Sequence, residues 1–266
     1  LFFIIVFFVF WVFSFWGLLS ASPLPFGLLA LTCSLIALRN QDDEIAGILL
    51  IIPFLMQGIF LVFFLFLFWW IFHHRRWGIL TGFGMTLGIL LLLSFLLLPD
   101  WVIPSMRGLY WHLIYQSEIS VHTILGSIWP VAGPRFGWII TILLGFILFI
   151  EWRGSREKPF NHFLWTTCFT LAMTPLLGLS IGMDGYAALS IPMVLLVGLL
   201  VDRWPGRKWP GAALISVSIA WFGGWILLVF SDPRTVILFP IFITAGLLWV
   251  KWWMIKPPRT MSETWQ

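Results

Sequence analysis

The residues best suited to chemistry lie in one polar segment, residues 99–133, within an otherwise hydrophobic chain. Asp100 stands there between Pro99 and Trp101. A carboxylate in this position can bind a cation, orient a hydroxyl group or act as a general base. The structural alternative is that Asp100 caps a helix starting near Ile103, because acidic side chains satisfy free backbone N–H groups. We take Asp100 as the candidate catalytic residue.

Further polar groups lie in the same segment. Arg107 carries a planar guanidinium that suits a lipid phosphate or, equally, a plain anchor among headgroups. His112, Glu118 and His122 follow, and the last two would share a face if that stretch is helical. Aromatic residues are interleaved with them, which is typical of chain in the headgroup layer. We therefore predict that residues 99–133 form an interfacial outer loop and that the chemistry takes place there.

Three candidates lie outside this segment. Gln57 stands beside a glycine in an interrupted hydrophobic stretch, where its amide either lines a cavity or bonds to a neighbouring helix. Asp184 lies in a glycine-containing turn, and its role is either to form the turn or to bind a ligand. Tyr186 is placed to anchor the chain at an interface. The candidate substrate-binding set is therefore Arg107, Gln57, His112, Glu118, Asp184 and Tyr186.

Metal and redox signatures are weak. His73 and His74 are adjacent, so on a helix their rings would point about 100° apart. Cys33 and Cys168 lie in hydrophobic stretches and form neither a disulfide framework nor a metal-binding spacing. The outer carboxylates could hold a divalent metal, but no motif requires one, and we expect no cofactor.

Composition determines which elements must position these residues. The chain has 266 residues, of which 61% are hydrophobic and 10% charged. No water-soluble domain covers that much apolar surface with so few charges. The net charge of +4 does not indicate nucleic acid, because the basic residues cluster at the ends of hydrophobic stretches. We predict an all-α, polytopic transmembrane helical bundle, one membrane domain over residues 1–266, with membrane lipids as partners.

About eight or nine hydrophobic segments make up this bundle: 1–19, 26–38, 45–72, 77–98, 136–150, 160–181, 186–201, 211–230 and 235–253. The third segment is too long for a single span. Pro53 removes a backbone donor and Gly58 loosens the helix, so we expect a break between a helix to about residue 53 and another over 59–72. Small residues four apart let helices approach closely, and two such pairs occur in the next segment, Gly78/Gly82 and Gly84/Gly88.

The charge pattern predicts an orientation. Four basic clusters fall on one side if every intervening segment crosses once: 73–76, 153–158, 202–210 and 251–259. The loops between them, at 99–133, 182–185 and 231–234, contain few basic residues. The positive-inside rule places the clusters in the cytoplasm. We predict a multi-pass protein of the plasma (inner) membrane, with a cytoplasmic C-terminus and an extracytoplasmic segment 99–133.

A family resemblance runs through residues 40–255. Residues 43–50, Asp-Glu-Ile-Ala-Gly-Ile-Leu-Leu, resemble the opening of a helix in glycosyltransferase family 87. Similar blocks follow in order: Arg75-Arg76-Trp77, Gly82-Phe83, Leu92-Leu93-Ser94, Pro99-Asp100-Trp101, Trp129-Pro130, Gly137-Trp138 and Val250-Lys251-Trp252-Trp253. The resemblance implies a GT-C type enzyme that transfers a sugar from a polyprenyl-phosphate donor on the extracytoplasmic face.

The chain also departs from that family. Residues 52–57 read Ile-Pro-Phe-Leu-Met-Gln where family members carry Lys-Pro-Gln, and a Gly-Gln pair is missing from residues 23–38. The acidic residue generally taken as catalytic in GT-C enzymes lies in a first outer loop, upstream of this chain's start. We expect a C-terminal part that lacks the N-terminal spans and that loop.

Two rival functions remain open. A non-catalytic membrane subunit or degenerate fragment fits the missing motifs. A transporter would require ionisable residues near the middle of the spans, lining a pathway, and the sequence offers little beyond Gln57 and prolines. An acidic outer loop upstream would favour the enzyme.

Overall fold

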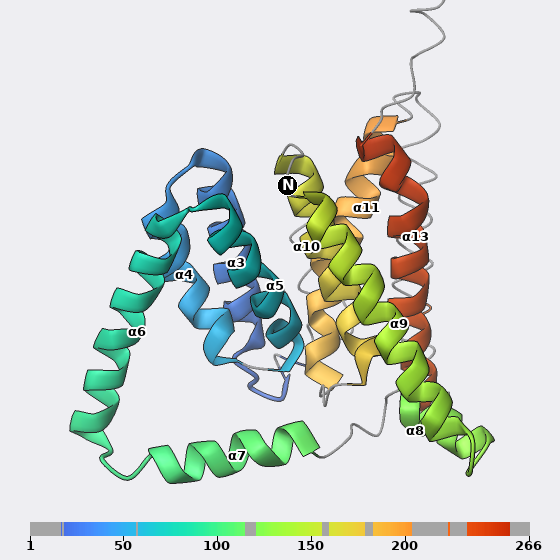
Figure 1. Cartoon of the computed structure of the whole chain (residues 1–266), viewed down its shortest axis with the longest axis horizontal. Coiled ribbons are helices and arrows are strands. Elements are labelled where there is room, and N and C mark those ends of the chain that lie inside the picture. Colours follow the sequence, from blue (N-terminus) through green and yellow to red (C-terminus); the bar gives the residue numbers. More distant parts are fainter. Residues whose placement is uncertain are drawn as a thin grey trace, which may run out of the picture.

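A computed structural model describes residues 17, 19–56, 58–114, 121–155, 160–178, 183–203, 223 and 233–255. Within these ranges every regular element is a helix and none is a strand (Figure 1). The all-α class expected from the sequence is thus confirmed for the described residues. The segments expected at 1–19 and 211–230 lie almost wholly outside them.

The helices form two groups joined by one helix that lies crosswise (Figure 1). The first group holds α3 to α6, and the second holds α8 to α13. Helix α7 lies across one end of the molecule. The elements are α3 (Leu24–Asn40), α4 (Asp43–Leu55), η1 (Gly58–Phe60), α5 (Leu61–His74), α6 (Trp77–Leu97), α7 (Val102–Ile114), α8 (Val121–Ile128), α9 (Gly133–Gly154), α10 (Phe160–Met173), η3 (Thr174–Leu177), η4 (Met183–Leu189), α11 (Ser190–Arg203), η5 (Pro233–Ile237) and α13 (Leu238–Ile255).

The break expected in residues 45–72 is present. Helix α4 contains Pro53 and ends at Leu55, and α5 begins at Leu61 after the single turn η1. Gly58 has φ of 58°, a left-handed conformation that glycine adopts without steric cost. The missing proline donor and this glycine together end one helix and redirect the chain into the next.

Helices α4 and α6 approach closely through glycines. A Cβ on Gly82 would collide with the backbone carbonyl of Glu44, and a Cβ on Gly47 would collide with that of Ile79. A Cβ on Gly78 would lie 2.9 Å from the Cβ of Asp43. The Gly78/Gly82 pair therefore acts as its spacing predicts. Gly84 and Gly88 have the same spacing, yet no atom of the described residues lies within 4 Å of a Cβ built on either.

Helix α10 is the centre of the second group. Eleven of its 14 residues are buried. Trp165 donates its indole N–H to the Leu247 carbonyl of α13 at 3.0 Å, and Trp152 of α9 donates to Thr170 at 2.8 Å. The α-helix is shorter than the expected segment 160–181, because Pro175 lies in the following turn, η3, and cannot continue the backbone ladder.

Two helices are long and apolar enough to cross a membrane, by length and composition alone: α6 and α9. Both expose many large apolar side chains, among them Leu92, Leu96, Ile142 and Phe146. Shorter apolar helices occupy Leu24–Asn40, Gly58–His74, Gly185–Leu199 and Thr235–Lys251. In the described part of the chain, these apolar helices indicate association with a membrane, and the number of crossings is not shown.

The described basic residues that end the helices gather at one end of the bundle, the upper end in Figure 1. Arg39 lies in the last turn of α3, Arg75 and Arg76 separate α5 from α6, and Arg153 lies in the last turn of α9. Lys251 of α13 forms an ion pair with Glu151 of α9 at the same end. We call this the basic end. Helix α7 lies at the opposite end.

The glycine contact makes a matched pair of substitutions informative. Gly82→Ala should lower the free energy of unfolding by about 1–3 kcal/mol, because the added methyl group forces α4 and α6 apart. Gly84→Ala should leave it unchanged or raise it by about 0.5–1 kcal/mol, since alanine favours helix and the site is open. Denaturant titration in detergent, followed by circular dichroism, measures both. Equal effects would contradict the α4–α6 contact.

Candidate functional site

Asp100 lies in the turn that joins α6 to α7. The first backbone hydrogen bond of α7 is accepted by the Trp101 carbonyl, from Ser105 at 3.0 Å. Trp101, and not Asp100, therefore occupies the N-cap position of this helix. The Asp100 side chain is exposed, and it makes no hydrogen bond or ion pair with any of the described residues. Its carboxylate is accessible to a ligand.

Arg107 is exposed on α7, seven residues after Asp100. No ion pair holds its guanidinium within the described part of the chain. One exposed carboxylate and one exposed guanidinium therefore lie on the same segment, which crosses this end of the bundle. His112 also belongs to α7, where only its backbone is described.

The other sequence candidates do not join this pair in the described structure. Gln57 and Glu118 lie outside the described residues. Asp184 belongs to η4, where its backbone alone is described. Tyr186, in the same element, has 1% of its surface exposed, so its ring lies in the core. Their roles in binding a substrate stay predictions.

His122 is a packed side chain at the hairpin between α8 and α9. It is 4% exposed and lies against Gly137 and Gly178, where an added Cβ would collide with its ring. Its Nε2 is 3.4 Å from the Thr141 hydroxyl, and the Trp138 ring lies edge-on with centroids 4.9 Å apart. Burial lowers the pKa of His122, which favours the neutral imidazole. The sequence did not predict the helix α8 around it.

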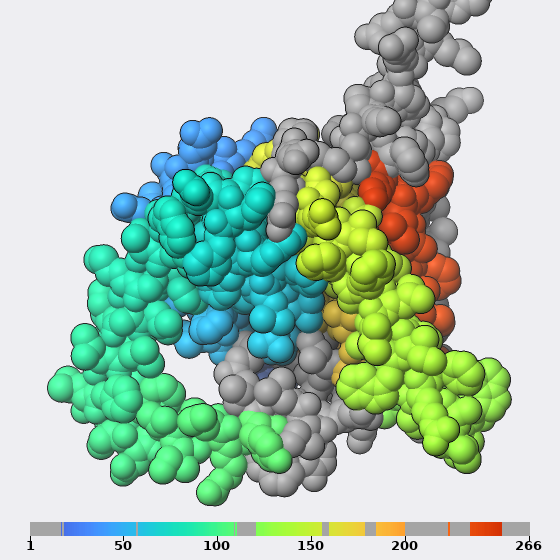
Figure 2. Space-filling model, viewed as in Figure 1, coloured from blue at the N-terminus to red at the C-terminus, as the bar shows by residue number. Residues whose placement is uncertain are grey.

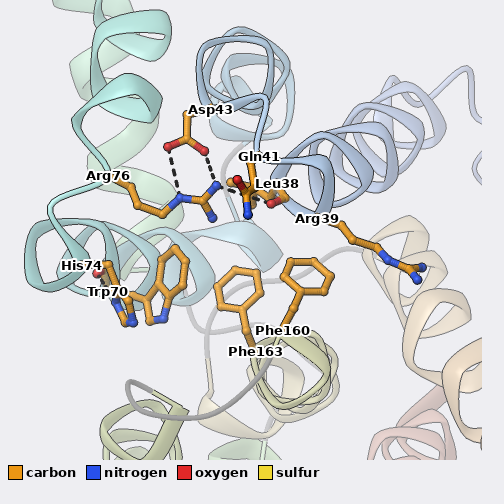
Figure 3. Close-up of a pocket in the computed structure, with 9 residues that line it drawn as sticks. All are labelled: Leu38, Arg39, Gln41, Asp43, Trp70, His74, Arg76, Phe160 and Phe163. Atoms are coloured by element: carbon orange, nitrogen blue, oxygen red, sulfur yellow. Dashed lines mark hydrogen bonds and ion pairs between the residues drawn. The ribbon is translucent and has the colours of Figure 1, made fainter.

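A cavity of about 450 Å³ opens at the basic end. It lies where the last turns of α3 and α5 meet the first turns of α4 and α10 and the residue that precedes α6 (Figure 3). We call it the basic-end pocket. Its lining residues are Leu38, Arg39, Gln41, Asp43, Trp70, His74, Arg76, Phe160 and Phe163.

Arg76 and Asp43 form one wall of the pocket. The Arg76 Nε lies 3.1 Å from an Asp43 carboxylate oxygen, and a second guanidinium nitrogen contacts the other oxygen. Arg76 also reaches the Leu38 carbonyl at 3.4 Å. Asp42 occupies the N-cap position of α4, and its side chain makes no cap hydrogen bond. The carboxylate of the next residue, Asp43, pairs with Arg76. Sequence analysis did not predict this pair, because its members are 33 residues apart in the chain.

Aromatic rings form the floor. The Trp70 and Phe163 centroids are 4.4 Å apart, which joins α5 to α10. His74 Nδ1 is 3.0 Å from the Trp70 carbonyl one turn earlier, and the Arg76 guanidinium lies 5.8 Å from the Trp70 ring. Figure 3 shows Phe160 beside Phe163 on the same floor. The pocket therefore combines an apolar base with cationic groups.

No group of three or more His, Cys, Asp or Glu side chains among the described residues could hold a metal ion. Comparisons of the chain with protein-family models, with curated proteins and with solved structures found no match. The resemblance to glycosyltransferase family 87 therefore stays a prediction carried by the sequence motifs.

The Arg76–Asp43 pair should stabilise the first helix group. Asp43→Asn should lower the free energy of unfolding by about 1–3 kcal/mol, because it leaves a half-buried guanidinium without its charged acceptor. Glu44→Gln, one residue along and exposed, is the matched control and should change it by less than about 0.5 kcal/mol. Denaturant titration of both variants checks this. Similar losses would show that net charge, and not the pair, is responsible.

His122 should make stability depend on pH. Its pKa in the folded protein lies below the ordinary 6.5, so the unfolded chain binds more protons just below that pH. The free energy of unfolding should therefore fall as pH decreases below about 6.5, and His122→Gln should remove that part of the loss. Its described neighbours Gly137, Trp138, Thr141 and Gly178 carry no charge. Parallel curves for variant and wild type between pH 7 and 5 would contradict the assignment.

Proposed function

We propose that the chain is a multi-pass membrane protein with its basic end in the cytoplasm and residues 99–133 outside. The exposed apolar faces of α6 and α9 support this, because acyl chains would cover them at no cost. The gathering of basic helix ends at one end of the bundle supports the orientation. A plasma-membrane location with the C-terminus inside follows from the same rule.

The shorter helices reach membrane thickness when their 3₁₀ extensions are counted. Helix α10 with η3 has 14 and 4 residues, and α11 with η4 has 14 and 7. At rises of roughly 1.5 and 2.0 Å per residue these lengths come to about 29 and 35 Å. The hydrocarbon layer is about 30 Å thick. Each pair therefore suits one crossing, which supports a bundle of more than two spans.

Within this orientation we propose that the protein transfers a sugar from a polyprenyl-phosphate donor on the extracytoplasmic side, as the membrane part of a GT-C type glycosyltransferase. The observation that carries the proposal is the exposure of Asp100 and Arg107, neither with a charged partner among the described residues, on the segment opposite the basic end. The sequence resemblance to family 87 supplies the reaction class.

Each group has a chemical task in this reaction. Asp100 would accept the proton of the acceptor hydroxyl as that oxygen attacks the anomeric carbon of the sugar, and the bond from that carbon to the phosphate oxygen breaks, which releases polyprenyl phosphate. Arg107 would hold the donor phosphate through its planar fork of N–H groups. Figure 2 shows the molecule hollowed between α6, α7 and the side of α4. The second half of α6, with Gly84 and Gly88 in open space, borders this hollow and offers apolar surface to a polyprenyl chain.

Native mass spectrometry tests the donor half of the proposal. The detergent-purified chain should carry a polyprenyl-phosphate sugar, and Arg107→Ala should weaken its binding by at least about tenfold, through loss of a charge-assisted contact. Arg135→Ala is the matched control, because Arg135 is also exposed at this end, in the first turn of α9. Equal loss in both variants would refute a specific role for Arg107.

Transfer assays test the catalytic half. Asp100→Asn should retain the donor adduct and lower the transfer rate by about 10²–10⁴-fold, since a general base contributes on this scale. Asp42→Asn, an exposed carboxylate at the other end, should leave the rate unchanged. A folded chain that keeps ordinary phospholipids but never binds the donor would instead support a non-catalytic membrane subunit.

A further inference from the structure

The basic-end pocket lies far from the proposed catalytic segment, on the opposite end of α6, and it has features of a binding site of its own. We propose that it binds a phosphate group, held by Arg76, Arg39 and Gln41, with the Trp70 and Phe163 rings against the apolar part that adjoins the phosphate. None of these residues belongs to α7. A failure of phosphate binding and a failure of the transfer reaction are therefore distinguishable.

Arg76 is already oriented for such a ligand. Asp43 and the Leu38 carbonyl engage its Nε and Nη2, which fixes the plane of the guanidinium. Figure 3 shows its remaining nitrogen and the Gln41 amide directed toward the ring-lined floor. A guanidinium held in place by a carboxylate loses little conformational freedom when it donates to an additional oxygen. Phosphate oxygens accept such planar donors well.

Arg39 supplies a second charge at the rim. It lies in the last turn of α3, is exposed, and makes no hydrogen bond or ion pair with the described residues. Figure 3 shows its guanidinium turned outward from the rings, so this long side chain has to change rotamer to reach a phosphate in the pocket. Among the described residues that line the pocket, Asp43 is the one carboxylate, and Arg76 neutralises it. The charge left at the rim is positive, which favours an anion.

The size of the cavity indicates more than a bare anion. A volume of about 450 Å³ leaves room for a glycerol-sized group beside the phosphate. Trp77 and Phe72 are exposed at the same level and contact each other edge-on at 5.6 Å. Exposed tryptophan beside arginine is typical of the headgroup layer. The phosphate can therefore come from a phospholipid headgroup that enters from the membrane or from a soluble phosphate ester.

A charge-matched pair of variants tests the site. Arg39→Gln removes a lining cation, and Arg75→Gln removes an exposed cation that does not line the pocket. Binding to the full detergent-purified chain is measured by native mass spectrometry with dioleoyl phosphatidylglycerol, glycerophosphoglycerol and inorganic phosphate. The affinity for the probe that binds the wild-type chain most tightly should fall about tenfold in Arg39→Gln and less than twofold in Arg75→Gln, since charge-assisted contacts have this strength.

The probes separate the two sources. Arg39-dependent binding of the lipid, without competition from millimolar glycerophosphoglycerol, supports a lipid headgroup. Arg39-dependent binding of either soluble probe, at least as tight as that of the lipid, supports a soluble phosphate. Binding that responds equally to Arg39→Gln and Arg75→Gln, or to neither, overturns the proposal.

A second variant guards against loss of folding. Arg76→Lys keeps a charge beside Asp43 while removing the planar fork. Its unfolding midpoint should stay close to that of the wild type, and its affinity for the bound probe should fall by about tenfold. Unchanged affinity in a folded Arg76→Lys chain also overturns the assignment.

Discussion

The close approach of α4 and α6 is the constraint on which the rest of the first helix group depends. Gly47 and Gly82 remove the side chains that would hold the two backbones apart. That contact brings the starts of both helices together, so that Asp43 and Arg76 meet. Phe54 and Phe83 then pack edge-on, with centroids 5.1 Å apart. The ion pair and the basic-end pocket are consequences of where the glycines stand.

The contact between α4 and α6 also explains how the chain is arranged at the end of the bundle where α7 lies. The buried residues of α6, namely Ile79, Gly82 and Phe83, all lie in its first half. Its second half has no partner of that kind among the described residues, and its large apolar side chains are exposed. A helix held at one end carries the following segment away from the core, and α7 is placed crosswise as a result (Figure 1). Asp100 and Arg107 owe their accessibility to this divergence.

Sequence analysis predicted the features that neighbouring residues determine, namely where helices break, begin and end. Pro53 and Gly58 break the helix, and α6 starts and ends within one residue of the expected bounds. Identical spacing could not tell Gly78/Gly82 from Gly84/Gly88, because only the position of α4 distinguishes them. Sequence analysis did not predict the pocket for the same reason, since its lining residues come from four helices and the turns between them. Of the candidate site, the exposed segment around Asp100 was predictable, because polar residues interrupting a hydrophobic chain must find water.

The charged residues fall into two classes, half-buried ion pairs and exposed single charges, because burying an unpaired charge costs free energy and exposing one does not. Asp43 with Arg76, and Glu151 with Lys251, are half-buried pairs that join one helix to another. Removing one member would leave a half-buried charge without its partner, so each pair stabilises the fold whether or not a member also binds a ligand. Asp100, Arg107 and Arg39 are exposed, where an unpaired charge costs little. Exposure by itself therefore indicates no function. What distinguishes these three is their position. Asp100 and Arg107 lie on the segment that crosses one end of the bundle, and Arg39 lines the basic-end pocket, so a ligand can reach each of them.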